Sequence, residues 1–108
     1  MGITFKENVA DIRNSKVADL VKELMQYSVH VHIVDPQASP NEVAHEYNLT
    51  LVDGPSKRYD AVIVAVAHDE YRNLGNEYFE EICQPDAILM DLKGLYPGQG
   101  QQLTYWRL

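Results

Sequence analysis

Four stretches of the chain carry the side-chain pattern of β-strands. In residues 29–35 (VHVHIVD), apolar and polar side chains alternate, as they do in a strand with one buried face. Residues 59–67 (YDAVIVAVA) form a nearly continuous run of small and β-branched side chains, which is typical of a central parallel strand covered on both faces. Residues 87–92 (AILMDL) predict a third strand, and residues 49–52 predict a short fourth one.

The segments between these strands carry helical patterns. Apolar residues at i, i+3, i+4 and i+7 predict an amphipathic helix over residues 15–27. Its apolar stripe would consist of Val17, Leu20, Val21 and Leu24. A second helix, reaching about Tyr47, is predicted after Ser39, because this capping serine is followed by a proline at the first helical position and by a glutamate three residues after the cap. Asn48 is suited to end that helix in a left-handed conformation.

The order of these elements indicates the fold class. Strands that alternate with helices predict a three-layer α/β domain with a mostly parallel sheet, and no repeat or linker divides residues 1–108. A doubly wound sheet ordinarily begins with a strand, but this chain enters its first helix without a full one. We therefore expect one Rossmann-like domain whose first strand is truncated. Residues 69–83 are expected to be helical but interrupted near Gly75, and residues 97–102 to form a polar loop.

Composition narrows the class of function. The chain has 108 residues and a net charge of −7, so a nucleic acid or an anionic membrane would repel the molecule as a whole. No apolar run approaches the roughly 20 residues that span a bilayer, and Lys6 and Glu7 interrupt any signal peptide. The single cysteine, Cys83, cannot form an internal disulfide, so nothing indicates secretion. We expect a cytoplasmic enzyme part or binding module without nucleic-acid or membrane partners.

A polar segment precedes the first predicted helix. Residues 4–16 (TFKENVADIRNSK) contain Lys6 and Arg13 among several hydrogen-bonding side chains. A helix N-terminus offers free backbone N–H groups and partial positive charge, and basic side chains add charge-assisted donors, so the segment is suited to hold a phosphate. The alternative is a solvated, charged loop in which Asp11 or Asn14 caps the helix. The pattern alone leaves both interpretations open.

Three further positions lie at the ends of predicted strands. His68 follows the most hydrophobic strand, where open α/β sheets bind ligands, but it is also placed to cap the next helix. Lys93 follows the last predicted strand at the same edge, where it could contact a ligand. The alternative is that Lys93 is an ordinary surface lysine without a binding role. We interpret Asp35 as a turn former ahead of proline, because the glycine fingerprint of dinucleotide sites is missing. The only Gly-x-Gly, at residues 98–100, lacks a strand-loop-helix context.

The sequence predicts neither a catalytic nor a metal site in this chain. Cys83 lies where a predicted helix ends and has no activating base beside it, so we interpret it as a buried, inert thiol. His30 and His32 share one strand face but have no further ligand at a metal-binding spacing. We therefore expect them to be ordinary polar residues of a strand.

The longest motif of the chain carries a family resemblance. Residues 2–16 (GITFKENVADIRNSK) resemble the start of the C-terminal domain in the UDP-glucose/GDP-mannose dehydrogenase family. Weaker motifs follow in the family's order: Asp35-Pro36, Glu46-Tyr47, Tyr59-Asp60-Ala61, Ala65-Val66-Ala67-His68 and Asp91-Leu92-Lys93. The first motif and the ending Trp106-Arg107-Leu108 are most similar to the bacterial branch that acts on UDP-N-acetylhexosamines for surface polysaccharides, including Vi-antigen and O-antigen enzymes.

The resemblance implies an activity and a division of roles between domains. Members of the family use two NAD⁺ to oxidise C6 of a nucleotide sugar to a carboxylate, through a cysteine-bound thiohemiacetal and thioester. An N-terminal Rossmann domain binds NAD, a central helical region dimerises, and the C-terminal domain, with strand order 3-2-1-4-5, closes over the nucleotide sugar. By motif match Phe5 and Lys6 would contact the UDP-sugar and Arg13 the NAD pyrophosphate. Lys93 stands where many relatives have arginine near the nucleotide, so it keeps the charge but loses the bidentate geometry.

The resemblance also implies what this chain lacks. The NAD fingerprint and the catalytic cysteine belong to the family's other two regions, and Cys83 matches neither the place nor the surroundings of that cysteine. We therefore expect an excised UDP-binding domain that does not turn over substrate alone. A stand-alone nucleotide-binding or regulatory α/β module and a purely structural partner domain are the alternatives.

Overall fold

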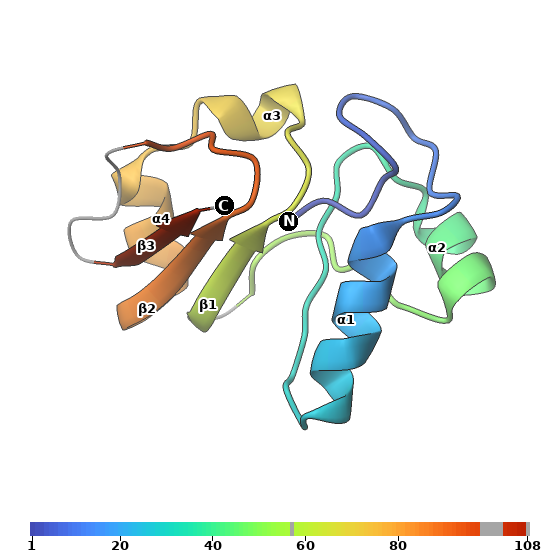
Figure 1. The fold of residues 1–108 in the computed structure, drawn as a ribbon, viewed down its shortest axis with the longest axis horizontal. Coiled ribbons are helices and arrows are strands. Elements are labelled where there is room, and N and C mark those ends of the chain that lie inside the picture. Colours follow the sequence, from blue (N-terminus) through green and yellow to red (C-terminus); the bar gives the residue numbers. More distant parts are fainter. Residues whose placement is uncertain (57, 98–102, 108) are drawn as a thin grey trace.

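A parallel sheet with helices packed around it confirms the expected α/β class. The computed structural model describes residues 1–56, 58–97 and 103–107. Its sheet has the order β1 (Tyr59–Val64), β2 (Cys83–Asp91) and β3 (Thr104–Arg107), and both neighbouring pairs are parallel. Figure 1 shows the helices of the C-terminal half behind and above this sheet, and the two N-terminal helices to the other side of β1.

Helix α2 begins and ends where its capping residues predict, whereas the cap of helix α1 is Ser15 rather than Asp11 or Asn14. Helix α1 (Lys16–Gln26) follows Ser15, and helix α2 (Pro40–Tyr47) follows Ser39. Each serine hydroxyl accepts a hydrogen bond from a backbone N–H in the first turn of its helix. Asn48 ends α2 with a φ of 56°, which is the left-handed conformation that asparagine tolerates better than most residues.

The region predicted to be an interrupted helix consists of two short helices. Helices α3 (Asp69–Arg72) and α4 (Asn76–Ile82) are separated by a turn that includes Gly75, as predicted. The prediction that the helix reaches Cys83 is wrong, because this residue is the first of β2. The loop predicted at residues 97–102 lies outside the described residues except for Pro97.

Two of the predicted strands do not form regular strands. Residues 29–35 and 49–52 share a single parallel bridge, between Ile33 and Leu51. Alternating side chains give these segments the pattern of strands, but a regular strand also needs backbone partners along its length. Conversely, β3 was not predicted, because a run of four residues (TYWR) is too short to carry a periodic signal.

The beginning of the chain lies between the two halves of the molecule. The Met1 amino group donates to the Ile63 carbonyl at 2.7 Å, and the Met1 carbonyl accepts from the Ala65 N–H at 2.9 Å. On its other side, the Gly2 N–H donates to the Val34 carbonyl at 2.8 Å. The spatial order is therefore 49–52, 29–35, 1–2, β1, β2, β3, which agrees with 3-2-1-4-5 plus one edge strand. Only two residues take the place of the first strand.

The buried apolar side chains form two separate clusters, one on each side of residues 1–2. The first, the sheet core, consists of Val62, Val64, Tyr71, Phe79, Cys83, Ala87, Leu89, Tyr96 and Leu103. The second, the helix core, consists of Ile3, Ile12, Ala18, Val21, Ile33, Val43 and Leu49. Each half of the domain thus buries its own set of apolar residues.

Candidate functional site

The loops that carry most of the predicted site residues gather at one edge of the molecule. Residues 4–8 follow the central position of the sheet order, Asp35 ends the extended segment, and His68 and Lys93 follow β1 and β2. Because these segments run parallel, their carboxyl ends share one edge, which is where such sheets bind ligands. In Figure 1 this edge is at the top of the view, around α3 and the blue N-terminal loop.

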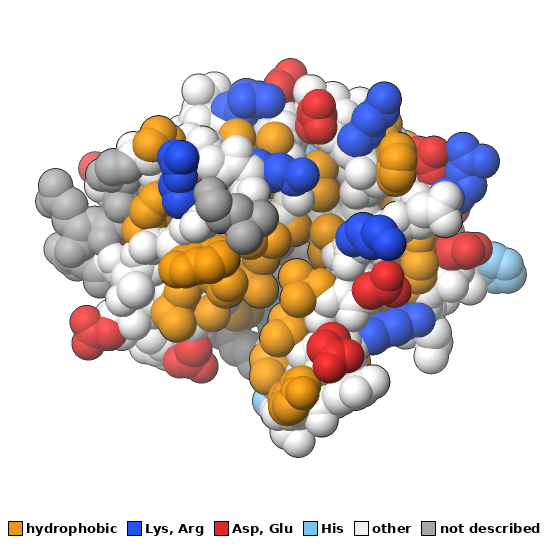
Figure 2. Space-filling model, viewed as in Figure 1, with side chains coloured by type: hydrophobic (Ala, Val, Ile, Leu, Met, Phe, Trp, Pro, Cys, Tyr) orange, Lys and Arg blue, Asp and Glu red, His pale blue; other side chains and the backbone are white. Residues whose placement is uncertain are grey.

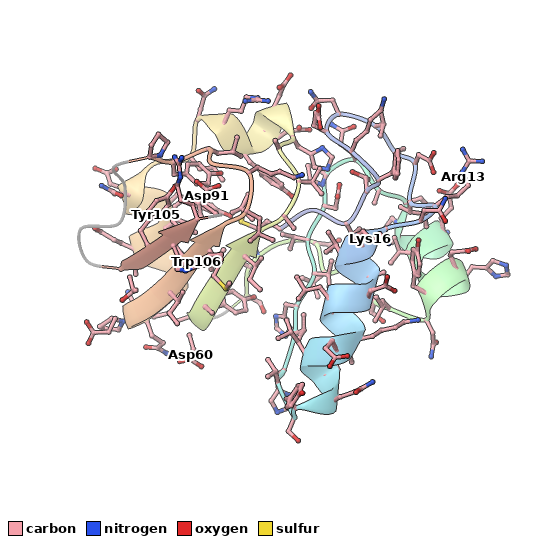
Figure 3. The ribbon with its side chains drawn as sticks, in the orientation of Figure 1. Arg13, Lys16, Asp60, Asp91, Tyr105 and Trp106 are labelled. Atoms are coloured by element: carbon pink, nitrogen blue, oxygen red, sulfur yellow. The ribbon has the colours of Figure 1, made fainter. Side chains whose placement is uncertain are left out.

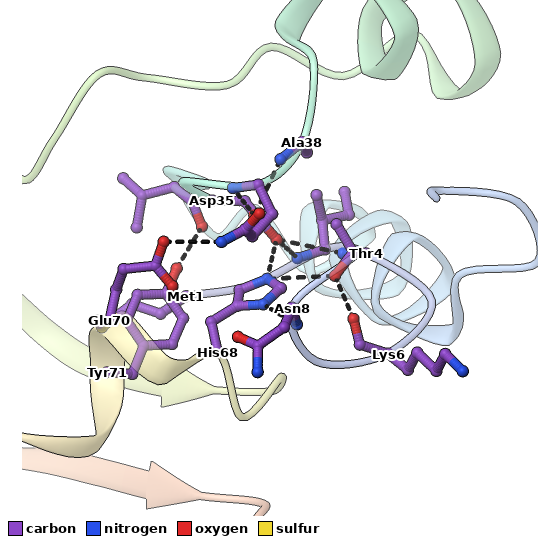
Figure 4. A network of polar contacts seen from close by, with 12 residues as sticks. Met1, Thr4, Lys6, Asn8, Asp35, Ala38, His68, Glu70 and Tyr71 are labelled. Atoms are coloured by element: carbon purple, nitrogen blue, oxygen red, sulfur yellow. Dashed lines mark hydrogen bonds and ion pairs between the residues drawn. The ribbon is translucent and has the colours of Figure 1, made fainter. Parts of the chain in front are cut away.

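Asp35 lies at the centre of a buried polar cluster at this edge (Figure 4). Its Oδ2 accepts from the Ile3 and Thr4 N–H groups at 2.6 and 3.2 Å. Its Oδ1 accepts from the Gln37 and Ala38 N–H groups at 2.7 and 3.1 Å, which confirms the predicted turn. Burial raises the pKa of the Asp35 carboxyl group, but hydrogen bonds, first that from Ile3, outweigh burial and hold the pKa below its usual value. Asp35 is therefore a carboxylate that ties two distant loops together.

His68 is the second member of this cluster, and its side chain is fully buried. The Asn8 N–H donates to Nδ1 at 2.9 Å, so Nδ1 carries no proton. Nε2 therefore carries the ring proton; it lies 3.0 Å from Asp35 Oδ2, to which it donates, and 3.2 Å from Thr4 Oγ1. These contacts fix the orientation of the ring between the loop at residues 4–8 and Asp35. His68 precedes α3 as a cap residue, but its side chain makes no capping hydrogen bond.

The same cluster fixes the backbone of the loop at residues 4–8. The Thr4 hydroxyl donates to the Lys6 carbonyl at 2.8 Å. Asn8, with a φ of 60°, accepts from the Asp69 N–H through Oδ1 at 2.9 Å and so joins the loop to the start of α3. Between these anchors Phe5 is 57% exposed, and the Lys6 side chain extends away from the cluster (Figure 4). The loop therefore presents an aromatic ring and a positive charge to solvent on a rigid support.

Asp91 holds the turn that carries Lys93. Its buried carboxylate accepts from the Leu95 and Tyr96 N–H groups at 2.9 and 2.8 Å, and from the Tyr105 hydroxyl at 2.6 Å. Burial raises the pKa of Asp91, but the hydrogen bonds, first that from Tyr105, outweigh burial and lower the pKa overall. Lys93 itself is exposed. This turn is built like the Asp35 cluster. In both, a buried aspartate accepts hydrogen bonds from backbone N–H groups, and an exposed lysine lies in the adjoining loop.

Arg13 does not belong to the same group of loops. Figure 3 places it beside α2, on the opposite side of the view from Asp91. Its side chain is 81% exposed and forms a two-point ion pair with Asp11, Nε to Oδ1 at 3.0 Å and Nη2 to Oδ2 at 2.9 Å. The hydrogen bond from Arg13 lowers the pKa of Asp11 to about 2. Arg13 also lines a hollow of about 490 Å³ together with Glu42 and Glu46 of α2.

The structure thus brings together some of the predicted site residues and separates others. Phe5, Lys6 and Lys93 share one edge, and all three side chains are exposed, whereas Arg13 lies apart from them. The supporting roles of Thr4, Asn8 and Asp91 were not predicted.

Cys83 and His32 lie away from the edge that carries Lys6 and Lys93. Cys83 is a free, buried cysteine, and burial raises the pKa of its thiol. His32 Nδ1 lies 2.9 Å from the Tyr59 hydroxyl, within hydrogen-bond distance. Within the described part of the chain, no three His, Cys, Asp or Glu residues gather as a metal site would require. The described helices also include none that is long and apolar enough to cross a membrane.

The fold and the edge define a class: a parallel α/β domain with polar loops at the carboxyl ends of its strands, as in nucleotide-binding domains of this architecture. Comparison with known proteins gives the family. Residues 1–98 match the UDP-binding domain of the UDP-glucose/GDP-mannose dehydrogenase family. This match covers nearly the whole chain, so the chain belongs to that family and corresponds to its UDP-binding domain.

Individual relatives agree with this assignment. The chain is 46% identical over 96 residues to a UDP-N-acetyl-D-glucosamine 6-dehydrogenase of Pseudomonas aeruginosa, covering 88% of this chain and 23% of that protein. It is 42% identical over 100 residues to the enzyme of the same name from Salmonella typhi, covering 92% and 24%. The UDP-N-acetyl-mannosamine dehydrogenase Cap5O from Staphylococcus aureus has the same fold, with a TM-score of 0.76 at 23% identity, covering 98% of this chain and 24% of that one. The chain spans about a quarter of the length of these relatives.

Proposed function

We propose that this chain is the nucleotide-sugar-binding domain of an NAD-dependent UDP-sugar 6-dehydrogenase. The enzyme oxidises C6 of a UDP-N-acetylhexosamine, or of UDP-glucose, to give a uronic acid for a capsule or O-antigen polysaccharide. The observation that carries the proposal is the loop at residues 4–8, whose backbone is fixed by a buried cluster while Phe5 and Lys6 stay exposed. The names of the relatives at 46% and 42% identity favour an N-acetylglucosamine substrate.

Lys6 supplies the positive charge that a diphosphate needs. An ammonium group binds phosphate oxygens through charge-assisted hydrogen bonds, and the Lys6 side chain is exposed on a loop that is already ordered. The exposed ring of Phe5 offers an apolar surface to the uracil or the sugar. Lys93 adds a second positive charge at the same edge, as a point charge rather than a bidentate fork. Because Phe5, Lys6 and Lys93 are exposed in this chain, we assign the other wall of the cleft to another domain of the enzyme.

Arg13 is assigned to the pyrophosphate of NAD, the cofactor that accepts hydride in this proposal. Asp11 engages two N–H donors of the guanidinium, and the remaining three are sufficient to contact a phosphate. The chain has no glycine fingerprint, so Arg13 supplies one contact to a cofactor that other domains bind.

The proposed partners are the NAD-binding and dimerisation domains of the same enzyme. We place the enzyme in the cytoplasm, in line with a single free cysteine.

Titration of the 108-residue chain with UDP-N-acetylglucosamine distinguishes a domain of a larger enzyme from a stand-alone module. One wall of a cleft supplies few contacts, so we expect a Kd near 1 mM, or about −4 kcal/mol, by calorimetry or NMR. We also expect no NADH production with NAD⁺ and any UDP-sugar. Sub-micromolar binding would favour the stand-alone nucleotide-binding or regulatory module, and NADH production would contradict the assignment of catalysis to other domains.

Substitutions in the intact enzyme test the separate roles of Lys6 and Arg13. Lys6→Ala is expected to raise the KM for the UDP-sugar, and Arg13→Ala the KM for NAD⁺, each by about 10- to 100-fold, the size expected from loss of a charge-assisted hydrogen bond. Lys16→Ala, which removes an exposed lysine at the start of α1, is the matched control. Equal shifts of both constants in both variants, or a lowered Tm alone, would show that this segment is only a structural cap.

A further inference from the structure

Strand β3 ends in a second exposed basic residue at the carboxyl edge. Arg107 is the last residue of β3 and pairs in register with Asp91, the last residue of β2. Because the two strands are parallel, their carboxyl ends meet at the edge that also carries Lys93. In Figure 2, blue side chains lie along the upper part of the molecule, above an orange area over the sheet. Arg107 thus reaches this edge through strand pairing, independently of the motif that contains Lys6.

The Arg107 side chain is held against the turn that carries Lys93. Tyr105 and Arg107 lie on the same face of β3, because they are two positions apart in a strand. The Tyr105 hydroxyl donates to Asp91 Oδ2 at 2.6 Å, and Figure 3 shows these two side chains together where β2 and β3 end. Burial and the Asp91 carboxylate raise the pKa of Tyr105 to about 12, whereas the Arg107 guanidinium opposes them through its charge and a hydrogen bond. Tyr105 therefore joins Arg107 to the buried support of this turn.

Gly94 leaves room for the guanidinium beside Lys93. A Cβ built on Gly94 would lie 4.0 Å from Arg107 Nη1. The φ of Gly94 is +67°, a conformation in which side chains are disfavoured, so this position of the turn suits glycine. The guanidinium of Arg107 thus lies over the backbone of the residue that follows Lys93.

The positive charges at this turn lack a neighbouring negative partner. Arg107 and Lys93 are both exposed, and neither forms an ion pair with any acidic residue in the described part of the chain. Asp91 is fully buried, and its carboxylate already accepts hydrogen bonds from backbone N–H groups and from Tyr105. The turn therefore presents two uncompensated positive charges in a molecule whose net charge is −7. Such a place attracts an anion.

We infer that Arg107 is a further binding residue at this edge, and that together with Lys93 it forms a site for a diphosphate group. A guanidinium binds two phosphate oxygens at once, whereas an ammonium group acts as a point charge. Arg107 thus supplies from β3 the bidentate contact that a lysine at position 93 does not give. Tyr105 engages only part of the five N–H donors of the guanidinium, so the others are available to the ligand. The inference rests on the proposed function for one point, the identity of the ligand as a UDP-sugar.

Titration of the 108-residue chain with inorganic pyrophosphate, followed by NMR, tests the anion site directly. We expect the backbone amide signals of Gly94 and Arg107 to shift. Arg107→Ala is expected to weaken binding at least tenfold, as for the loss of a charge-assisted hydrogen bond. Lys93→Arg in the Arg107→Ala background is expected to restore most of the lost affinity, because it returns a guanidinium to the turn. Arg58→Ala, which removes an exposed arginine just before β1 at the opposite edge of the sheet, is the matched control and should leave binding unchanged.

UDP-N-acetylglucosamine and NAD⁺ both contain a pyrophosphate group, so separate titrations identify the source of the diphosphate. We expect the UDP-sugar to shift the Gly94 and Arg107 signals, with the same loss of affinity in Arg107→Ala, and NAD⁺ to shift neither. Shifts with NAD⁺ alone would overturn the assignment to a nucleotide sugar. Shifts with pyrophosphate and with neither nucleotide would support the anion site but contradict the proposed function.

Two further results would overturn the inference itself. Unchanged Gly94 and Arg107 signals in the presence of pyrophosphate would show that this edge holds no diphosphate. If Arg107→Ala lowered Tm without weakening pyrophosphate binding, or if Lys93→Arg restored no affinity in that background, Arg107 would serve only to support Tyr105 and the turn.

Discussion

The two halves of this domain hold their backbones in different ways. In the half from residue 59 onward, β1, β2 and β3 pair along their lengths and pack on the sheet core. In residues 1–56, the extended segments share one bridge, and the helix core rests on capped helices and on hydrogen bonds from side chains to the backbone. Where a segment lacks regular strand neighbours, a few buried polar side chains must define its position.

Each half has one buried aspartate at the carboxyl edge, and these two residues make the comparison concrete. Asp91 collects the Leu95 and Tyr96 N–H groups from its own half. Asp35 collects N–H groups from residues 3–4 and 37–38 and also bonds His68, which belongs to the other half. Asp35 therefore joins the two halves, whereas Asp91 stabilises one of them.

Replacement of these aspartates should give the largest effects. Asp35→Ala leaves four backbone N–H groups and the His68 ring without their acceptor. We expect the free energy of unfolding to fall by about 3–5 kcal/mol, because each buried donor left unsatisfied costs about 1–3 kcal/mol. Asp91→Ala should lower it by about 2–3 kcal/mol, because fewer donors lose their acceptor. Urea denaturation measures both. A smaller loss for Asp35→Ala than for Asp91→Ala would contradict the linking role of Asp35.

A substitution at Gly2 tests whether the two halves are in close steric contact, whereas the aspartate substitutions test their hydrogen bonds. A Cβ at this position would lie 2.6 Å from the Val66 Cβ, and the φ of +93° is unfavourable for any side chain. We expect Gly2→Ala to lower the free energy of unfolding by about 2–3 kcal/mol, the size expected from overpacking together with backbone strain.

Gly54→Ala is the control for this change, because nothing lies within 4 Å of a Cβ there. We expect a change of about 0.5 kcal/mol or less. Thermal or urea denaturation of both variants measures these changes in the free energy of unfolding. Equal effects of the two substitutions would mean that residues 1–2 do not form a close contact between the halves.

The sequence predicted the local features of this molecule better than the pairings between distant segments. Ser39 and Asn48 define the ends of α2 through interactions within a few residues, so a short window carries the whole signal. The strand predicted at residues 29–35 depends on neighbours on both sides. Its alternating pattern contains no information on whether a partner strand is present, so the prediction of a regular strand is wrong.

In the candidate site, too, the sequence predicted a local feature but not the contacts between distant segments. The motif around Lys6 predicts a binding loop, and the structure shows residues 5–8 to be exposed, with hydrogen bonds that hold the loop backbone. The support from Asp35 and His68 was not predicted, because each residue alone fits a turn or a helix cap. The available signal was their shared position after two strands whose carboxyl ends meet at one edge.

Acid should weaken the connection that Asp35 makes between the two halves. The folded-state pKa of Asp35 is lowered, so its contribution to stability is complete above the unfolded value of about 3.9 and is lost as pH falls below it. We therefore expect the free energy of unfolding to decrease below about pH 4. Asp35→Asn should make that decrease shallower, whereas Asp60→Asn, at an exposed position of β1, should leave it unchanged. Parallel acid titrations of the three proteins check this, and identical slopes would exclude Asp35 as a contributor.

The smallest effect is expected at the helix caps, where the two halves also differ. Helices α1 and α2 of the first half have serine caps with side-chain hydrogen bonds, whereas α4 begins after Gly75, which has no side chain to supply one. Nothing lies within 4 Å of a Cβ at Gly75, and its φ of −111° suits any residue. Gly75→Ser should therefore raise the free energy of unfolding by a few tenths of a kcal/mol, up to about 0.5, because its hydroxyl can accept from the first turn of α4. Ser39→Ala should lower it by about 1 kcal/mol. Chemical denaturation measures both changes. A loss of stability on Gly75→Ser would show that the turn between α3 and α4 requires glycine for a reason other than capping.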